Sequence, residues 1–287
     1  MVSLPVSCLI TSYNNLSTLP RAIESVLNQS EKFSEIIIAD DGSSDGSREF
    51  IKYFAEKNSL IKPLYNSSNL GPSGNRDNAI RVSSCPFFTQ LDGDDYFCRH
   101  KLKNEWNALG GSENKIAFSR ILLINELNPL KCSARNPSAH GIFATDKYFE
   151  FLLTRSVHEP RDMLMSKKLY EAVGGYNFEL NVYEDWDLKL RLAASNAEWV
   201  FAHGFGTVYM QHNSGLSELS TIHDIQKIIA MYEDLILKKT GKDYQYFQEL
   251  YNKPRSKSES YLLRSSLFDK YKALRPFVKH LVAKRLR

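Results

Sequence analysis

The sequence predicts an α/β protein with a mostly parallel sheet flanked by helices. Over roughly the first 120 residues, short apolar runs alternate with segments whose apolar residues recur at helical spacing. Polar and acidic clusters follow the apolar runs directly, as expected where buried strands end in loops. This alternation predicts right-handed βαβ units, which place helices on both faces of a sheet.

The first half of the chain supplies these elements in order. PVSCLIT (5–11) is typical of a buried strand. Leu19, Ile23 and Val26 then recur at helical spacing, which predicts a helix over 16–28 capped by Ser17 or Thr18. EIIIADDGSSDGS (35–47) predicts a second strand and a polar turn. The pattern continues with a helix over 47–57, a strand over 61–65, a helix over 73–83 and a strand over 87–91.

The regular alternation ends after Leu123 in a Pro-, Asn- and Ser-rich stretch typical of a loop. It resumes near Asp162. MLMSKKLYEAVGGYNF (163–178) predicts a strand or short helix, then a helix that ends at the Gly174-Gly175 pair. EDWDLKLRLAAS (184–195) predicts an amphipathic helix with Trp186, Leu190 and Ala193 or Ala194 facing inward.

The composition is that of an ordinary globular protein, with 43% hydrophobic and 24% charged residues. No apolar run reaches roughly 18 residues, so no transmembrane helix is expected. The N-terminus lacks the basic and long apolar regions of a signal peptide. Four scattered cysteines without a C-x-x-C pair argue against a zinc site and a disulfide framework. We therefore expect a cytoplasmic protein, and no nucleic-acid partner.

The C-terminal segment 253–287 is strongly basic, with 11 Lys or Arg and 2 acidic residues. Its apolar residues recur at near-helical spacing, which predicts a helical extension over 216–287 with a basic amphipathic tail. One interpretation is peripheral contact with an anionic membrane surface on the cytoplasmic face. The alternative is a helix packed on the main domain with a solvated basic face.

Three carboxylates, Asp92, Asp94 and Asp95, follow the strand predicted over 87–91. Mg²⁺ and Mn²⁺ take such oxygen ligands, usually one or two carboxylates together with substrate phosphates. A cation there would neutralise charge that builds on a departing diphosphate. The alternative is an acidic turn that only caps the next helix.

A second acidic cluster begins at Asp40 and Asp41, also at a strand end. In open α/β sheets ligands bind outside the carboxyl ends of the strands, so both clusters can meet one ligand. Carboxylates here can accept the imide N–H of a pyrimidine or a ribose hydroxyl, although Asp-Gly-Ser is also common turn chemistry. The sequence contains no Walker A motif and no GxGxxG, which disfavours P-loop and NAD chemistry.

Two further groups are candidates for chemistry. Asp185 begins a predicted helix; it can act as a general base or, with Glu184, simply favour the helix start. His212 closes an apolar strand, where it can ligate a metal, donate to phosphate or serve the structure alone.

The chain resembles the inverting family 2 glycosyltransferases of GT-A fold. The resemblance covers about residues 4–215 and is specific because the segments occur in family order. It implies a Rossmann-like GT-A domain over 1–215, with a nucleotide-sugar half over about 1–124 and an acceptor half over about 125–215. The segments are VSCLITSYNN, AIESVLNQS, EIIIADDGSSDGS, NLGPSGNRDNAI, PFFTQLDGDDYF, VGGYNFEL and EDWDLKLRL.

The resemblance also implies roles at the donor site. Asp41 would contact the base, with Thr11 and Tyr13 beside it. The family's Gly-x-x-x-x-Arg-Asn pattern gives Arg76, but Asp77 stands where Asn is usual. The D-x-D signature falls on Asp92-Gly93-Asp94 and implies a divalent metal, Mn²⁺ or Mg²⁺, on the diphosphate of a nucleotide sugar.

Asp94 is the first choice as metal ligand, Asp95 its possible replacement, and His212 matches a family histidine near the metal. The E-D pair implies that Asp185 deprotonates the acceptor hydroxyl. The expected function is metal-dependent transfer from a UDP-sugar to a glycan or lipid-linked acceptor in surface polysaccharide or lipopolysaccharide synthesis. Two alternatives stay open: a nucleotidyltransferase, and a catalytically inactive nucleotide-sugar-binding protein.

Overall fold

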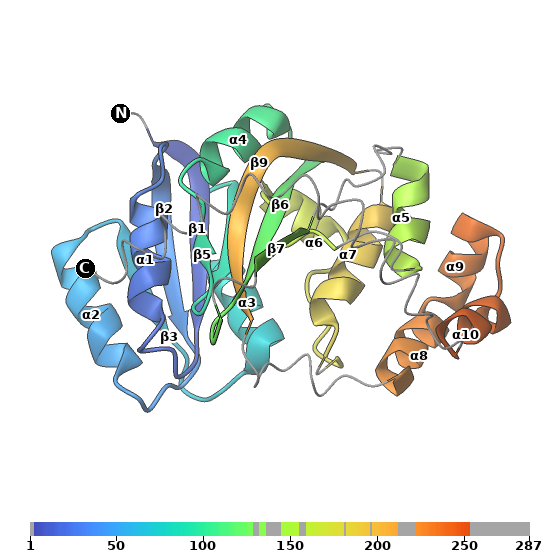
Figure 1. Cartoon of the computed structure of the whole chain (residues 1–287), viewed down its shortest axis with the longest axis horizontal. Coiled ribbons are helices and arrows are strands. Elements are labelled where there is room, and N and C mark those ends of the chain that lie inside the picture. The colour runs from blue at the N-terminus through green and yellow to red at the C-terminus, as the bar shows by residue number, and fades with distance from the viewer. Residues whose placement is uncertain are drawn as a thin grey trace. The chain divides into compact units, whose positions relative to one another are not determined.

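The structure is a computed structural model that describes residues 3–128, 132–135, 145–154, 159–180, 182–195, 197–211 and 222–252 (Figure 1). The chain divides into two compact units. The first unit comprises Met1–Ile121 and Asn136–Tyr209, and the second comprises Leu122–Arg135 and Met210–Arg287.

The first unit contains a five-stranded sheet with the strand order β3-β2-β1-β4-β8. Four strands run parallel, and the short β8 pairs antiparallel to β4. The predicted mostly parallel α/β sheet is therefore confirmed. The strands are β1 (Leu4–Ser12), β2 (Phe33–Asp40), β3 (Ile61–Tyr65), β4 (Phe87–Asp92) and β8 (Met165–Ser166).

Helices cover both faces of this sheet (Figure 1). The chain moves in one direction across the sheet from β1 to β3, so the right-handed crossovers α1 (Leu19–Leu27) and α2 (Ser47–Lys57) share a face. The crossover from β3 back to β4 runs the other way, so α3 (Gly71–Val82) lies on the opposite face. The core between α1, α2 and the sheet includes the buried residues Val6, Cys8, Ile10, Leu19, Ile23, Ile36, Ile38 and Ile51.

The start of α1 differs from the prediction. The helix begins at Leu19, because Pro20 suits the first turn, where its missing N–H costs no hydrogen bond. Thr18 occupies the cap position but makes no side-chain capping bond; its hydroxyl donates instead to Asn15 O at 3.2 Å.

Strand register brings the polar loops together. Ser12 at the end of β1 pairs with Asp40 of β2, and Thr11 pairs with Asp92 of β4. Because the strands are parallel, the loops that follow them leave the sheet at the same edge. The two acidic clusters therefore lie at one edge of the sheet, as the sequence predicts.

A second sheet has the strand order β5-β9-β6-β7. The helices α5 (Thr145–Leu153) and α7 (Glu184–Ala194) pack together in the first unit, where the Trp186 indole N–H donates to Leu152 O at 3.1 Å. The burial predicted for Trp186, Leu190 and Ala193 is confirmed. The remaining elements up to residue 211 are β5 (Tyr96–Phe97), α4 (Lys101–Leu109), β6 (Lys115–Asn125), β7 (Cys132–Arg135), α6 (Lys167–Ala172) and β9 (Glu198–Gln211).

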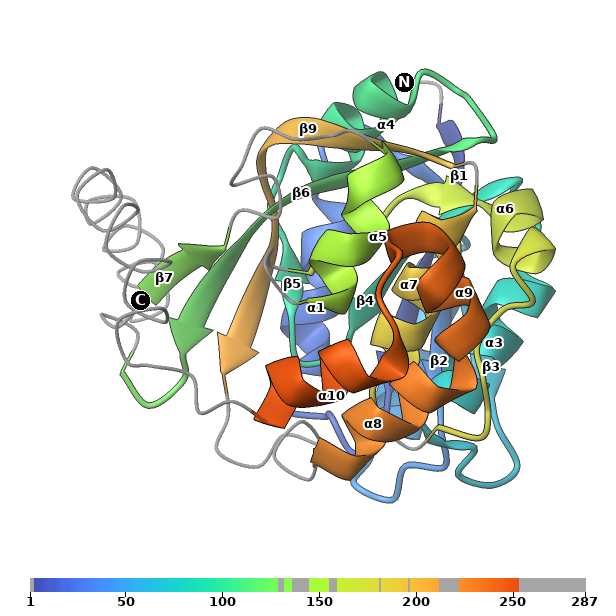
Figure 2. The same ribbon diagram turned by 90° about the vertical axis from the view of Figure 1, so that its right-hand side faces the viewer.

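Within the second unit, α8 (Ile222–Met231), α9 (Glu233–Thr240) and α10 (Tyr244–Asn252) form a group of three short helices (Figure 2). The described part of the predicted C-terminal extension is thus helical. Its basic tail, 253–287, lies outside the described residues. Within the part of the chain that the structure describes, no helix combines the length and apolar character needed to cross a bilayer.

Candidate active site

The chain turns sharply at Gly93, directly after β4. The Gly93 N–H donates to Thr11 O at 2.8 Å, and Thr11 Oγ1 donates to Asp92 Oδ1 at 3.0 Å. A Cβ at position 93 would lie 2.8 Å from Thr11 O, closer than real Cβ atoms approach, so a side chain would force the turn to shift. The Asp95 N–H donates to Asp92 O at 3.0 Å. The middle residue of Asp-Gly-Asp is therefore glycine for a steric reason.

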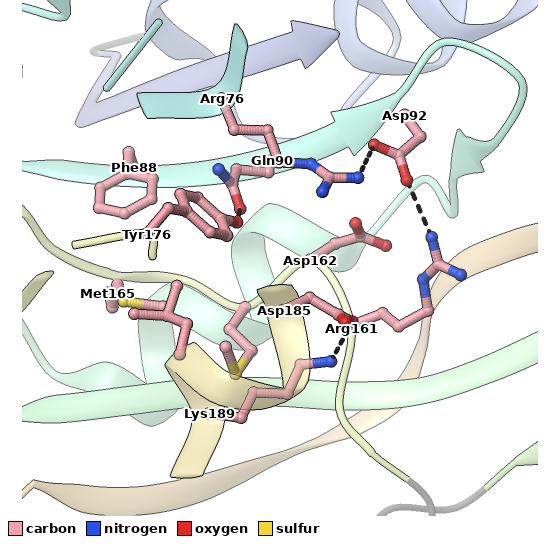
Figure 3. Close-up of a pocket in the computed structure, with 12 residues that line it drawn as sticks. Arg76, Phe88, Gln90, Asp92, Arg161, Asp162, Met165, Tyr176, Asp185 and Lys189 are labelled. Carbon is pink, nitrogen blue, oxygen red and sulfur yellow. Dashed lines mark hydrogen bonds and ion pairs between the residues drawn. The ribbon is translucent and has the colours of Figure 1, made fainter. Parts of the chain in front are cut away.

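Two arginines hold the Asp92 carboxylate, one on each oxygen (Figure 3). Arg76 Nη2 donates to Asp92 Oδ1 at 2.9 Å, and its Nη1 donates to Glu184 Oε1 at 2.7 Å. Arg161 Nη2 donates to Asp92 Oδ2 at 2.9 Å and lies 3.5 Å from Asp95 Oδ2. Arg76 on α3 thus bridges the end of β4 and the start of α7.

The surroundings shift the pKa values of Asp92 and Asp95 in opposite directions. Burial opposes ionisation of Asp92, but Arg76 and Arg161 outweigh it and lower the pKa of Asp92 to about 2. Burial raises the pKa of Asp95 well above its usual range; Arg161 opposes this, and the nearby carboxylates add to it. Asp92 is therefore a fixed negative charge.

The first turn of α7 carries Glu184 and Asp185, where the helix dipole favours negative charge. Lys189 lies one turn later and donates to Asp185 Oδ2 at 2.6 Å and to Glu159 Oε2 at 3.1 Å. The Lys189 side chain is 5% exposed, whereas that of Asp185 is 46% exposed. Asp185 therefore forms an ion pair with a buried cation while part of its side chain remains exposed to solvent.

Electrostatics favour the ionised form of Asp185. Desolvation opposes ionisation, but Lys189 dominates and holds the pKa of Asp185 well below its usual range. The pKa of the adjacent Glu184 is raised by burial and by the charge of Asp185, against the effect of Arg76. A carboxylate that stays deprotonated across ordinary pH can accept a proton.

These residues line one cavity of about 50 Å³ (Figure 3). Its mouth is charged and its inner wall is apolar, with Gln90 and Tyr176 between the two regions. The mouth comprises Arg76, Asp92, Arg161, Asp162, Asp185 and Lys189, and the inner wall comprises Phe88, Met163, Met165 and Leu188. Predicted residues Arg76, Asp92 and Asp185 thus line one pocket although they are distant in sequence.

Asp41, predicted to contact the base, is 3% exposed. Its Oδ1 accepts hydrogen bonds from Asn66 Nδ2 at 2.8 Å and from the Leu70 N–H at 2.9 Å. Its Oδ2 accepts one from the Gly71 N–H at 2.9 Å. A carboxylate oxygen has two lone pairs, so Oδ2 retains capacity for one further donor. The role at the base stays a prediction.

The predicted nucleoside loop after β1 is tied to the loop after β2. The Asn14 N–H donates to Ser43 Oγ, and Asn14 Oδ1 accepts from the Ser44 N–H, each at 2.9 Å. Tyr13 is 51% exposed beside them, while Thr11 lies under the acidic turn. The structure thus places Thr11 next to Asp92 and leaves the Tyr13 ring accessible.

The rest of the second acidic cluster supports the fold. Asp40 Oδ1 accepts from Arg48 Nε at 2.6 Å and from two main-chain N–H groups of its own turn. Asp45 Oδ1 accepts from the N–H and hydroxyl of Ser47 at the start of α2. These bonds are the turn chemistry that is the alternative interpretation of DDGSSDGS.

The acids after Gly93 have the donor chemistry that a hard divalent cation takes. Asp94 is half-buried, and its main-chain oxygen accepts from Arg21. Among the described residues no group of three or more His, Cys, Asp or Glu is arranged to hold a metal ion. His212 lies outside the described residues. A cation here would therefore need ligand atoms from substrate, as Mg²⁺ sites on phosphates commonly do.

Asp77 departs from the usual Asn of the family pattern, and the structure gives a reason why it is tolerated. The side chain is buried and accepts from Tyr170 Oη at 2.8 Å and from Arg81 Nε at 2.5 Å. The charge is thus paired, and Arg76 beside it still reaches the pocket.

Several pocket residues were absent from the predicted site: Arg161, Lys189, Gln90 and Tyr176. Tyr176 lies in VGGYNFEL and Lys189 in EDWDLKLRL, so a helical wheel pairing Asp185 with Lys189 was an available signal. Arg161 follows the irregular middle of the chain. We find no local sequence pattern that connects it to Asp92.

Comparisons with known proteins give the family of the chain. Residues 7–174 match the sequence profile described as Glycosyl transferase family 2. The chain is 39% identical over 118 residues to a cholesterol galactosyltransferase of Borreliella burgdorferi, covering 41% of this chain and 33% of that protein. It is 35% identical over 114 residues to the Escherichia coli UDP-Glc:alpha-D-GlcNAc-diphosphoundecaprenol beta-1,3-glucosyltransferase WfaP, covering 40% and 44%. The match thus spans less than half of either relative.

A solved structure shares the fold. S. aureus TarS 1-349 in complex with UDP-GlcNAc superposes with a TM-score of 0.67 at 15% identity, covering 86% of this chain and 70% of that one. The GT-A architecture expected from the sequence is therefore confirmed.

Proposed function

Because the chain belongs to glycosyl transferase family 2, and is thus a glycosyltransferase, we propose that it moves a sugar from a nucleotide-diphosphate donor to an acceptor hydroxyl with inversion. The observation that carries this proposal is the pocket shared by Asp92 and Asp185. One carboxylate comes from the strand end that faces the donor in this fold, and the other comes from the start of α7.

UDP is the proposed nucleotide. TarS has been solved with UDP-GlcNAc, and the name of the E. coli relative specifies UDP-Glc. Thr11, Tyr13 and Asp41 would hold the nucleoside, with the remaining lone pair of Asp41 Oδ2 available to a base N–H. Asp92, fixed by Thr11 and the two arginines, would accept from sugar or ribose hydroxyls.

Asp185 is the proposed general base. Its carboxylate would take the proton of the acceptor hydroxyl as that oxygen bonds to the anomeric carbon. The bond from that carbon to the diphosphate oxygen breaks on the opposite face, so one displacement inverts the configuration. Lys189 keeps the base ionised before the reaction.

A divalent cation, Mn²⁺ or Mg²⁺, would neutralise charge on the departing diphosphate when bound. Asp94 is the proposed ligand, with Asp95 as its possible replacement and His212 as a further candidate. Arg76 and Arg161 would keep Asp92 in place beside it.

The proposed acceptor is a glycan or lipid-linked saccharide in surface polysaccharide synthesis, because the name of the E. coli relative specifies a diphosphoundecaprenol-linked sugar. We assign catalysis to residues 1–215 and propose that the basic tail, within the extension 216–287, contacts an anionic membrane surface.

A screen of UDP-sugars with Mn²⁺ tests the donor proposal directly. We expect thermal stabilisation and slow release of UDP from at least one UDP-sugar, because ligand binding stabilises the folded state. Release of pyrophosphate from a nucleoside triphosphate and sugar phosphate would instead indicate a nucleotidyltransferase. Binding without any turnover, even with a range of sugar acceptors, would favour an inactive binding protein.

A further inference from the structure

Gln90 lies on β4, two residues before Asp92, and its amide faces the pocket between Arg76 and Tyr176 (Figure 3). Tyr176 Oη donates to Gln90 Oε1 at 2.8 Å. Burial raises the pKa of Tyr176 to about 12, against the effect of Arg76, so the phenol keeps its proton and remains a donor. The phenol thus fixes one end of the amide.

The other end of the amide is unsatisfied. Gln90 Nε2 is buried, and no acceptor for it exists among the described residues. A buried donor without a partner costs about 1–3 kcal/mol, so such groups usually mark a place for water or a ligand.

The surroundings of Gln90 differ from the mouth of the pocket. Most charged groups at the mouth are paired with one another, Asp92 with two arginines and Asp185 with Lys189, although Asp162 Oδ2 is also buried without a partner among the described residues. Beyond Gln90 the wall consists of Phe88, Met163, Met165 and Leu188. The whole pocket, mouth included, has a volume of about 50 Å³, which exceeds the space that one water molecule needs, about 10–15 Å³.

We infer that this inner region receives the acetamido group of the donor sugar, so that the enzyme uses an N-acetylhexosamine donor. An acetamido group presents a carbonyl oxygen and an N–H, which suit an amide partner in either orientation, and a methyl group that suits the methionine-rich wall. A hydroxyl at the same position leaves the apolar wall without contact. This inference rests on the proposed function and specifies its substrate class.

The test compares matched donors in pairs: UDP-GlcNAc with UDP-Glc, and UDP-GalNAc with UDP-Gal. Binding is measured by calorimetry and turnover by UDP release, both with Mn²⁺. One hydrogen bond and one buried methyl predict a preference of roughly tenfold to a hundredfold for the acetamido member of a pair. The ratio within a pair cancels contributions from the nucleotide and the metal.

Two substitutions assign the preference to these residues. Gln90→Met keeps the length of the side chain but removes the amide, and it should lower the ratio by roughly twofold to tenfold, the share of the hydrogen bond. Tyr176→Phe frees the amide and should reduce the ratio by a smaller factor. Tyr53→Phe on the exposed surface of α2 is the matched control and should keep the wild-type ratio.

Equal use of both members of each pair, or a preference for UDP-Glc or UDP-Gal, would overturn the inference while leaving the proposed function intact. A wild-type ratio in Gln90→Met would overturn it as well. Absence of binding to all four UDP-sugars would refute the UDP-sugar proposal itself, and the inference with it.

Discussion

Lys189 Nζ lies 2.6 Å from Asp185 Oδ2, one helical turn along α7, and its own side chain is almost fully buried. A cation placed this way stabilises the deprotonated carboxylate and so weakens it as a base. Asp185 is therefore a weaker base than an unpaired carboxylate, but it stays ionised at ordinary pH.

Lys189→Met should therefore move the acid limb of the pH–rate profile to higher pH. In the wild type Lys189 keeps the pKa of Asp185 low, so the base is ionised and activity is present at any pH above that pKa. Without Lys189 the pKa of Asp185 rises, because desolvation is then opposed less, and Asp185 becomes protonated at a higher pH. Activity at low pH relative to pH 7.5 should therefore be lower in the variant than in the wild type. UDP release from the preferred UDP-sugar is the measurement.

Glu159→Gln serves as the control for this change. It removes the other acidic partner of Lys189 but keeps the Lys189 pair with Asp185. The acid limb should stay in place or move to lower pH, because the lysine charge then acts on Asp185 alone. An unshifted acid limb in Lys189→Met would show that Lys189 serves packing only.

Asp185→Asn should reduce UDP release by about 10²- to 10⁴-fold, the usual contribution of general base catalysis. The amide retains the shape of the side chain and an oxygen that can accept from Lys189, so UDP binding should remain near wild type by calorimetry. Asp187→Asn on the same helix is the control: Asp187 is buried against Arg191, so that change should lower stability and retain chemistry. Full turnover in Asp185→Asn would remove the assigned role.

Asp94→Ala should weaken Mn²⁺-dependent UDP binding by roughly tenfold or more, the scale of losing one hydrogen bond or contact to a charged group. Binding without Mn²⁺ should change little. Asp45→Asn alters an acid that accepts from the Ser47 N–H at the start of α2, and it should leave the Mn²⁺ dependence unchanged. A Mn²⁺ titration curve identical to wild type in Asp94→Ala would reassign the ligand to Asp95.

Gly93→Ala should impair UDP binding and lower the melting temperature. Its Cβ would meet Thr11 O at 2.8 Å, and the turn must move to relieve the contact, at about 1–3 kcal/mol. Each kcal/mol corresponds to roughly 2–4 °C in a domain of this size. Gly110→Ala is the comparison. Its φ of +61° disfavours a side chain, so stability should fall. No heavy atom lies within 4 Å of the added Cβ, so UDP binding should persist. Normal binding in Gly93→Ala would show that the turn is tolerant.

The sequence predicted the features that depend on local order along the chain. Alternating strands and helices indicated the parallel sheet, and parallel strand ends bring Thr11 and Asp92 into register. Apolar spacing in α7 predicted the burial of Trp186 and Leu190. Such features follow from periodicity, because the position of a residue in its own element decides its burial.

The features that the sequence did not predict depend on tertiary contacts. Arg161 meets Asp92 across 69 positions of the chain, and Asn66 reaches Asp41 across 25. The periodicity of apolar residues in a sequence does not indicate side-chain contacts between such distant positions. The unsatisfied end of Gln90 is also invisible in a sequence, because it depends on the absence of an acceptor among spatial neighbours.

Thr11 accepts a hydrogen bond through its carbonyl oxygen and donates another through its hydroxyl, both to the acidic turn. A substitution that reshapes the first loop would therefore also displace the carboxylate that two arginines hold. Under the proposed function, the loop beside the base and the carboxylate beside the sugar would therefore change together rather than separately. Under the same proposal, a change of nucleotide preference that spares Asp92 would fall on the exposed Tyr13 ring and on Asp41, whose Oδ2 retains capacity for one further donor.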